Sequence, residues 1–399
     1  MGATKNFFKS KKPWSEFKDK MLGWYLKPYI NKLLYMPKRL YIIDCFAGKG
    51  KFDDGSIGSP LIIANKIREI LNDTNRKNRE INGIFIENKY GKYLKENLTG
   101  YTKCFSKNKS FEECIDGICE LARKANIFLY IDPYGIKNLK FDYINKMCSS
   151  SCEGCNSIEM FINFSSIGFI REACRLLKYN HDVFKDEIEG DEDDYEIQEV
   201  SIENMNRIFN GDSWQQIIKD FYNKKISFYS LEEKITQEYM KNFNSEFKYC
   251  LNIPIRTKQK NTPKYRMIFC TNSNDGLILM NQNMNDTLKL MKEEEAKGQI
   301  SLFNLLGFNN EECLEKYIIR HINDNSKIEY KDLVCKTIMD VNIRYNEHDI
   351  REKLSIMEKQ SIIKIDRIPK KGYTPKRKLT GWDTRKYDII IFKLSTLLI

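Results

Sequence analysis

Short apolar runs that end in an acidic residue and a tight turn recur along the first half of the chain. One is Tyr41-Ile-Ile-Asp-Cys-Phe-Ala-Gly-Lys-Gly50, and another is Phe128-Leu-Tyr-Ile-Asp-Pro-Tyr-Gly135. Continuous apolar runs of this kind are typical of parallel strands that are buried on both faces. Parallel strands bring the loops at their carboxyl ends to one edge of the sheet, where open α/β folds bind their ligands. We therefore expect a ligand site at that edge.

Helical patterns separate the apolar runs and indicate the fold class. We expect strands at 40–46, 82–87, 101–105, 126–131 and 157–164, and helices near 59–72, 89–98, 109–124, 141–149 and 167–177. Gly58-Ser-Pro60 predicts the start of the first of these helices, with Ser59 as its N-cap. Strands that alternate with helices of this length predict right-handed βαβ units and a mostly parallel, Rossmann-like sheet. Two further runs, 247–255 and 264–271, predict an antiparallel hairpin that completes the sheet.

An N-terminal segment, an insertion and a long final helix define the extent of the first domain. Residues 1–39 predict a basic, amphipathic helical lead-in, because ten Lys or Arg stand against two acidic residues up to position 40. Residues 178–245 predict an acidic and helical insertion that includes Glu187-Ile-Glu-Gly-Asp-Glu-Asp-Asp194. A long helix to about residue 297 closes the domain, which is therefore expected to span 1–300.

Residues 309–399 have a different pattern. Three helices at 311–323, 331–341 and 347–360 precede two strands at 362–366 and 387–392, which is the order of a winged helix-turn-helix domain. The loop 367–386 has eight Lys or Arg against one Asp, together with Tyr373 and Trp382. Basic side chains beside aromatic rings are typical of nucleic-acid surfaces, although a protein contact with a solvated basic loop is the alternative. The candidate nucleic-acid residues are Arg351, Lys353, Lys370, Lys371, Lys376, Arg377 and Lys378.

The overall composition narrows the class of protein further. The net charge of +11 favours a polyanionic partner. Twelve cysteines, several of them inside apolar stretches, indicate reduced, buried thiols in a cytoplasmic protein. The first residues lack the apolar core of a signal peptide, and no apolar run approaches the roughly 20 residues of a membrane-spanning helix. We expect a cytoplasmic protein that binds nucleic acid and no membrane.

The first loop has the spacing Asp-x-x-x-Gly-x-Gly over residues 44–50. It is not a phosphate-binding P-loop, because Cys45 stands in place of the first glycine and Phe52 in place of the magnesium-binding Ser or Thr. The spacing is typical of class I methyltransferases, whose glycines admit the methionine part of S-adenosylmethionine; an ordinary glycine turn is the alternative. Candidate cofactor residues are Asp44, Phe46, Ala47, Gly48, Gly50 and Glu87, which ends the second strand where a ribose-binding acid belongs.

The second loop, Asp132-Pro-Tyr-Gly135, follows the fourth expected strand. Amino-methyltransferases have at this place a side-chain oxygen and a proline carbonyl that accept both N–H groups of a base, which aims the nitrogen lone pair at the methyl group. The candidate catalytic residues are therefore Asp132, Pro133, Tyr134 and Gly135, with Tyr134 stacking on an extruded base. Asn163-Phe-Ser165 is expected to line the same site. A β-turn with Pro and Gly is the alternative.

These motifs together resemble a known family. The segments Lys12-Pro-Trp14, Asp44 to Gly50, Gly58-Ser-Pro60, Ile86-Glu87, Ile131 to Gly135 and Met267 to Thr271 are similar to the three-Cys-motif partner family (TcmP), over most of the first 300 residues. The resemblance implies a class I methyltransferase-like domain with an attached winged helix. Through the family's name it also implies a partner protein with a three-cysteine motif.

The corner at 132–135 also resembles the Asp-Pro-Phe-Gly of tRNA guanine-N2 dimethyltransferases. It lacks the second proline of the Asp-Pro-Pro-Tyr found in adenine-N6 enzymes. The target base is therefore left open.

Three cysteines, Cys148, Cys152 and Cys155, have the spacing of a radical S-adenosylmethionine iron–sulfur site. They lie between the fourth and fifth expected strands, however, and not after the first strand of a barrel. Neither His181 nor Cys174 has zinc-finger spacing as a fourth ligand. We expect no metal site.

The expected function is S-adenosylmethionine-dependent methyl transfer to an exocyclic amino group of a nucleobase in DNA or RNA. The alternative is a non-catalytic scaffold with a methyltransferase fold, which binds nucleic acid and works with a three-Cys-motif partner protein.

Overall fold

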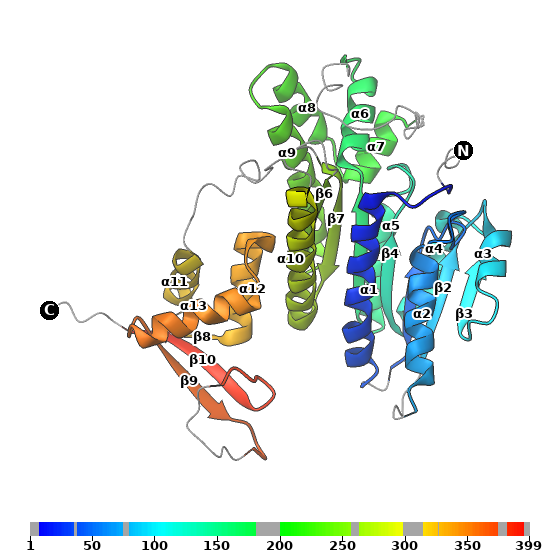
Figure 1. Cartoon of the computed structure of the whole chain (residues 1–399). Coiled ribbons are helices and arrows are strands. Elements are labelled where there is room, and N and C mark those ends of the chain that lie inside the picture. Colours follow the sequence, from blue (N-terminus) through cyan, green and yellow to red (C-terminus); the bar gives the residue numbers. More distant parts are fainter. Residues whose placement is uncertain are drawn as a thin grey trace. The chain divides into compact units, whose positions relative to one another are not determined.

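The computed structural model describes residues 8–35, 38–74, 80–180, 200–256, 263–297, 314–325, 327–373 and 381–394. These residues belong to two compact units, which are Met1–Asn272 with Leu290–Ile300 and Ser273–Lys289 with Ser301–Ile399. Helix α10 (Asn274–Lys297; Figure 1), which the sequence places in the first domain, is divided between the two units.

The first unit is built on a seven-stranded sheet with the strand order β3-β2-β1-β4-β5-β7-β6. Strands β1 to β5 are parallel, and β7 pairs antiparallel with both β5 and β6. This order, with one antiparallel strand between β5 and β6, is that of class I methyltransferases, and the predicted Rossmann-like α/β fold is confirmed. The strands are β1 (Leu40–Asp44), β2 (Ile81–Ile86), β3 (Cys104–Lys107), β4 (Asn126–Ile131), β5 (Ile158–Phe164), β6 (Tyr249–Arg256) and β7 (Pro263–Thr271).

One predicted strand is displaced along the chain. The sequence places a strand at 101–105, whereas β3 begins at Cys104. The chain turns over residues 98–103 instead, where Gly100 and Lys103 have φ angles of 87° and 59°. A backbone in the left-handed region cannot continue a strand. The extended run therefore starts only after Lys103.

Side chains of the central strand β4 alternate between two layers of helices. Phe128 packs against Tyr25 of helix α1 (Pro13–Leu33), with the ring centroids 5.7 Å apart. Ile127 and Leu129 lie in an apolar core shared with helices α4 (Phe111–Ala122), α5 (Phe141–Glu153) and α6 (Ser166–Leu176). Because successive side chains of a strand point to opposite faces, β4 is buried on both, as its apolar run predicts.

The predicted helical insertion is joined to the sheet by a buried ion pair. Arg266 on β7 donates to both carboxylate oxygens of Glu232 on helix α9, at 2.9 and 2.5 Å. The acidic segment Glu187 to Asp194 lies outside the described residues. The remaining helices of this unit are α2 (Ser59–Asn72), α3 (Gly91–Asn97), α7 (Ile202–Phe209), α8 (Trp214–Tyr222) and α9 (Phe228–Lys241).

The second unit combines helices with a small antiparallel sheet of order β8-β10-β9. Its three helices and the hairpin β9-β10 agree with the expected elements, whereas β8 is too short to have an alternating sequence pattern. The assignment as a winged helix-turn-helix stays a prediction. None of the described helices is both long and apolar enough to cross a membrane. The elements are α11 (Leu314–Asn325), β8 (Lys327–Glu329), α12 (Tyr330–Val341), α13 (Glu347–Lys359), β9 (Ile363–Pro369) and β10 (Tyr387–Lys393).

A buried carboxyl group fastens α1 to the sheet. Glu159 on β5 accepts hydrogen bonds from the hydroxyl groups of Tyr25 and Thr271, at 2.5 and 2.7 Å. Burial raises the pKa of Glu159 to about 7, although both hydrogen bonds act to lower it. The position of α1 along the sheet is therefore set at Tyr25.

Replacing Tyr25 by Phe leaves one oxygen of the buried Glu159 carboxyl without its donor. We expect a loss of stability of about 1–3 kcal/mol, the cost of an unsatisfied buried polar group. The measurement is the midpoint of urea unfolding. Tyr35→Phe is the matched control, because Tyr35 is 87% exposed. Equal midpoints for Tyr25→Phe and the unmodified protein would contradict the anchoring role of Glu159.

Candidate functional site

The carboxyl ends of β1 and β4 lie side by side at one edge of the sheet. The two strands pair in parallel with Asp44 opposite Tyr130, and the amide of Cys45 donates to the carbonyl of Tyr130 at 2.9 Å. Asp132 follows Tyr130 by two residues. The acidic side chains that end the two strands are therefore neighbours, as the apolar runs predict.

The loop after β1 turns sharply at its two glycines. Gly48 and Gly50 have φ angles of 62° and 82°, in the left-handed region that favours glycine. The carbonyl of Gly50 accepts a hydrogen bond from the amide of Gly58 at 2.9 Å, which closes the loop onto the start of α2. The amide of Ala47 donates to the carbonyl of Ile86 at 3.0 Å, so the loop is also joined to the end of β2. Both glycines of the predicted cofactor motif are required by the conformation of the loop.

Glu87 links the glycine loop to the loop after β2. Its carboxylate accepts hydrogen bonds from the amide of Gly48 at 2.9 Å and from the amides of Lys89 and Tyr90 at 2.7 and 3.0 Å. A carboxylate has about four lone-pair sites. One acceptor site therefore remains on the oxygen that faces Gly48.

Asp44 is fully buried at the end of β1. Its carboxyl accepts hydrogen bonds from the hydroxyl of Ser59 at 2.7 Å and from the amide of Phe46 at 3.2 Å. Burial raises the pKa of Asp44 to about 7; the two hydrogen bonds offset this only in part, and the nearby Asp132 and Asp19 raise it further. At neutral pH this carboxyl is poised between its neutral and charged forms.

The prediction that Ser59 caps α2 is wrong. The helix begins at Ser59 itself, Gly58 is the N-cap residue, and no side chain caps the first turn. The N-cap residue Gly58 has no side-chain oxygen to accept from the amides of the first turn, and the Ser59 hydroxyl donates to Asp44. The motif Gly58-Ser-Pro60 therefore contributes a side chain to the site.

Asp132 is held by three donors. Its Oδ2 accepts from Lys18 Nζ in a close ion pair and from the hydroxyl of Tyr130 at 3.2 Å, while its Oδ1 accepts from the side-chain amide of Asn163 at 2.7 Å. Asn163 lies near the end of β5 and is one of the residues expected to line this site. Gly135 closes the corner with a φ of 85°. The structure brings Asp132 and Asn163 together and adds Lys18, which sequence reasoning missed.

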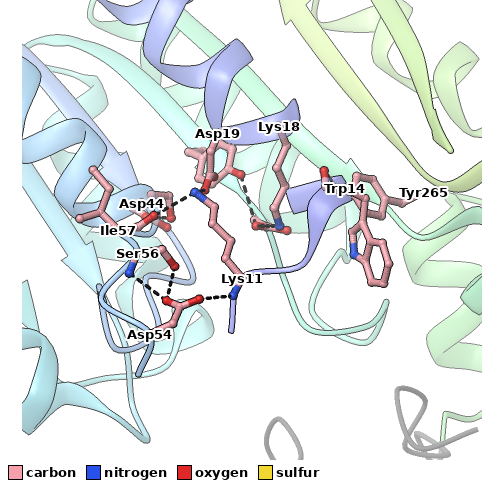
Figure 2. A network of polar contacts seen from close by, with 12 residues as sticks. Lys11, Trp14, Lys18, Asp19, Asp44, Asp54, Ser56, Ile57 and Tyr265 are labelled. Carbon is pink, nitrogen blue, oxygen red and sulfur yellow. Dashed lines mark hydrogen bonds and ion pairs between the residues drawn. The ribbon is translucent and has the colours of Figure 1, made fainter. Parts of the chain in front are cut away.

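Lys18 belongs to a polar network from the N-terminal part of the chain, which Figure 2 shows. Lys11 Nζ forms an ion pair with Asp19 at 2.6 Å and donates to the carbonyl of Ile57 at 3.0 Å. The amide of Lys11 donates to the carboxylate of Asp54 at 3.1 Å. The start of α1 is thereby tied to the loop that follows β1.

Residues 8–12, which we call the N-terminal strap, also contact the glycine loop. A methyl group added at Gly48 would lie 3.4 Å from the buried ring of Phe8. That ring packs edge-on against Tyr90, with the centroids 4.8 Å apart, and the ammonium of Lys49 lies over it at 4.7 Å. The carbonyl of Phe8 accepts a hydrogen bond from the amide of Asp53 at 2.8 Å. The strap therefore meets the same loop as the candidate cofactor residues.

The described residues at this edge include three neighbouring aspartates, Asp19, Asp44 and Asp132, and two lysines. Burial raises the pKa of Asp19, although Lys11 and Lys18 act to lower it. Burial by itself would lower the pKa of Lys18, but attraction to Asp132 and Asp19 outweighs it, so the pKa is raised and Lys18 stays an ammonium. With all five groups charged, the cluster has one negative charge in excess. A ligand with a single net positive charge would balance it.

A signal for Lys18 is present in the sequence. Lys18 precedes Tyr25 by seven residues, which is about two helical turns, so both side chains project from the same face of α1. That face also carries the buried residues Met21 and Leu22. A charged residue in line with the apolar face of a helix is a candidate for a site, and composition counts do not detect it.

The three cysteines with iron–sulfur-type spacing differ in solvent exposure. Cys148 is buried on α5, whereas Cys152 and Cys155 are exposed. Within the described residues, no group of three or more His, Cys, Asp or Glu side chains is arranged to hold a metal ion. His181 lies outside those residues.

The candidate nucleic-acid residues have different surroundings in the second unit. Lys370 and Lys353 form ion pairs with acidic side chains at 3.2 and 3.5 Å, whereas Lys371 is exposed. Arg351 contacts the ring of His348 at 2.9 Å. The other three candidates lie outside the described residues: Lys376, Arg377 and Lys378.

The two aromatic residues of the basic loop pack within their own unit. Trp382 contacts the ring of Tyr330, with the centroids 5.0 Å apart, and the guanidinium of Arg367 lies over it at 5.1 Å. Tyr373 packs edge-on against Tyr387. These contacts position the two rings beside the hairpin β9-β10.

No protein-family model and no curated protein matches the chain. Among solved structures, the chain is similar to a protein of Legionella pneumophila str. Philadelphia 1 from the DUF519 family, with a TM-score of 0.39 and 8% identity over 69% of this chain and 91% of that one. The methyltransferase domain of a bacterial Hen1 protein has a TM-score of 0.29 and 8% identity, over 64% of this chain and 100% of that one. The plantazolicin methyltransferase BamL, solved with a desmethyl analogue and SAH, has a TM-score of 0.28 and 9% identity, over 65% and 85%.

The raised pKa of Asp44 predicts how stability depends on pH. In the unfolded chain this carboxyl loses its proton near its ordinary pKa of 3.8, whereas in the fold it keeps the proton up to about pH 7. The stability that the proton confers is therefore complete below about pH 4 and is lost as the pH rises to 7, at about 1.4 kcal/mol per pH unit. Asp44→Asn cannot titrate, so its thermal midpoint should fall less between pH 5 and pH 7 than that of the unmodified protein.

The matched control for this prediction is Asp116→Asn. Asp116 is exposed on α4, and its hydrogen bond with Lys146 lowers its pKa, so it titrates below this range. The same slope in Asp44→Asn as in the unmodified protein would show that Asp44 does not hold a proton in the fold.

Proposed function

We propose that the chain is an S-adenosylmethionine-dependent methyltransferase that acts on an exocyclic amino group of a nucleobase in DNA or RNA. The observation that carries the proposal is the adjacency of Asp44 and Asp132 at the carboxyl edge of a methyltransferase-type sheet. One strand end would hold the methyl donor and its neighbour would hold the acceptor.

The glycine loop and its acidic neighbours fit the cofactor. The remaining acceptor site on Glu87 suits a ribose hydroxyl, and the buried Asp44 suits the ammonium of the methionine part. Phe46 and Ala47 complete the loop around Gly48 and Gly50. With Asp44 ionised, the aspartate cluster would have one negative charge in excess. That charge would match the cofactor, whose sulfonium and ammonium outweigh its carboxylate by one charge. The bound cofactor supplies an activated methyl group, and the residues of this chain hold and orient it.

The corner after β4 fits an amino group as acceptor. Asp132 has one acceptor site left on Oδ1, since its other contacts go to Lys18, Tyr130 and Asn163. That oxygen and the carbonyl of Pro133 would accept the two N–H groups, which leaves the nitrogen lone pair to attack the methyl carbon. The amine can lose its proton during or after the attack, so positioning supplies much of the rate. Tyr134 would stack on the base, with Gly135 completing the turn.

The basic residues of the second unit would neutralise backbone phosphates. The candidates are the residues predicted from the sequence, of which Lys371 is exposed. Following the resemblance to the TcmP family, we also propose a three-Cys-motif protein as a partner in the cell.

Asp132→Ala tests the acceptor site. We expect transfer of a tritiated methyl group from S-adenosylmethionine to a mixture of total RNA and genomic DNA to fall by about 100-fold or more, because the acceptor amine loses its orientation. Asp116→Ala, on an exposed face of α4, is the matched control and should keep full activity. Undiminished transfer by Asp132→Ala would remove Asp132 from the mechanism.

The alternative is a non-catalytic scaffold with a methyltransferase fold. It is favoured by the N-terminal strap, since Phe8 packs on the glycine loop that the cofactor would meet. The scaffold predicts no binding of S-adenosylmethionine or S-adenosylhomocysteine in calorimetry, or binding with no transfer to any nucleic acid. Methyl transfer by the unmodified chain would exclude it.

Salt dependence tests the nucleic-acid surface. Removal of one lysine that neutralises a phosphate should reduce the slope of log K against log salt by about 0.9. We therefore expect the double variant Lys370→Gln with Lys371→Gln to bind a labelled duplex more weakly and with a slope lower by about 2 between about 50 and 200 mM salt. The matched control is Lys124→Gln with Lys146→Gln, two exposed lysines of the first unit. An unchanged slope in the first pair would place the nucleic acid elsewhere.

A further inference from the structure

We propose that Lys18 is a positioning residue of the acceptor site: its ammonium, presented by α1, orients the Asp132 carboxylate and balances its charge so that one oxygen receives the acceptor amine. This inference rests on the proposed function. It adds a residue that lies outside both strand-end loops and comes from a different part of the chain (Figure 2).

The contacts of Asp132 define which oxygen is left for a substrate. Lys18 and Tyr130 both donate to Oδ2, which fills its two lone-pair sites. Asn163 donates to Oδ1 and fills one site there, so a single acceptor site remains on the carboxylate. Without Lys18, a site on Oδ2 would also be open. An amine could then bind in two ways, of which only one points its lone pair at the methyl group.

The ammonium of Lys18 also offsets repulsion within the cluster. Besides Lys18, the titratable groups that interact electrostatically with Asp132 are Asp19 from α1, Asp44 from β1, Tyr130 from β4 and Tyr265 from β7. Both tyrosines are buried, and burial raises the pKa of each, so they stay neutral. Lys11 contacts Asp19 rather than Asp132. Lys18 is therefore the cation in direct contact with Asp132 among the described residues.

The anchoring of α1 makes this contact a fixed part of the site. Tyr25, on the same face of the helix, is hydrogen-bonded to the buried Glu159, and Met21 and Leu22 between them are buried. The carbonyl of Trp14, at the start of α1, accepts a hydrogen bond from Tyr265 at 2.9 Å. Lys18 is thus held from both sides along the helix, with its side chain 14% exposed.

The test compares Lys18→Met, Lys18→Arg and the control Lys20→Met in the full chain, by the pH profile of methyl transfer. Lys20 is exposed on the same helix. We expect Lys18→Met to lower kcat about 100-fold at pH 7 with KM for S-adenosylmethionine within about threefold. Its half-maximal pH should move upward, because the cluster takes up a proton more readily without the ammonium. Lys18→Arg should restore most of the rate, and Lys20→Met should behave as the unmodified protein.

A purely structural ion pair would give a different result. In that case Lys18→Met would unfold at a lower temperature, but its pH profile would have the unmodified shape, and this outcome would overturn the inference. No transfer by the unmodified chain would overturn the proposed function and the inference with it. Transfer with an unaltered profile in Lys18→Met would overturn the inference without affecting the proposed function.

A second readout examines the ion pair between Lys18 and Asp132 and does not depend on methyl transfer. Brief acetylation of the ligand-free protein, followed by mass spectrometry, should label Lys18 more slowly than Lys20. In Asp132→Asn the labelling of Lys18 should increase, because its charged partner is removed. Equal labelling of both lysines in the unmodified protein would show that the pair does not form, and the inference would fail whatever the activity.

Discussion

The carboxyl edge of the sheet depends on charge compensation between groups that are largely removed from water. Burying an unpaired ion costs several kcal/mol even after the protein relaxes, so three neighbouring aspartates can share this space only if cations face them or protons are retained. Both solutions are present: Lys11 and Lys18 supply two cations, and the raised pKa of Asp44 supplies a retained proton near neutral pH. Since both lysines come from the N-terminal region, the site is completed by a part of the chain that lies outside the sheet.

The same balance connects ligand binding with stability. A cation bound at this edge would allow Asp44 to ionise without leaving an unpaired charge, so the proposed cofactor would relieve the cost that the ligand-free fold carries. The neutral product S-adenosylhomocysteine would do so less, since it lacks the sulfonium charge. Under the proposed function, the electrostatics of the site would therefore favour the substrate form of the cofactor over its product.

The features that sequence analysis predicted are local ones. An apolar run followed by an acidic residue and a glycine predicts the end of a buried strand without knowledge of its neighbours. The ends of β1 and β4 and their adjacency could therefore be predicted from Asp44 and Asp132. For Lys18 the sequence shows only that a charged residue lies in line with the apolar face of a helix. Its contact with Asp132 also requires the position of α1 on the sheet, where Tyr25 is hydrogen-bonded to Glu159, 134 positions away in the sequence. The role of Ser59 was missed for a related reason: only the tertiary structure shows that the buried carboxyl of Asp44 lies within reach of its hydroxyl.

The ion pair between Arg266 and Glu232 has a consequence for any attempt to shorten the protein. Arg266 is buried on β7 and points to α9, while its neighbour Tyr265 reaches Trp14 at the start of α1. Excising the helices at 202–241 would leave the buried guanidinium of Arg266 without its carboxylate partner Glu232, at a cost of about 3–5 kcal/mol for a broken buried pair. This loss of stability would affect β7, the strand that pairs with β5. The inserted helices are therefore part of the minimal folding unit, and a trimmed version would need an apolar residue in place of Arg266.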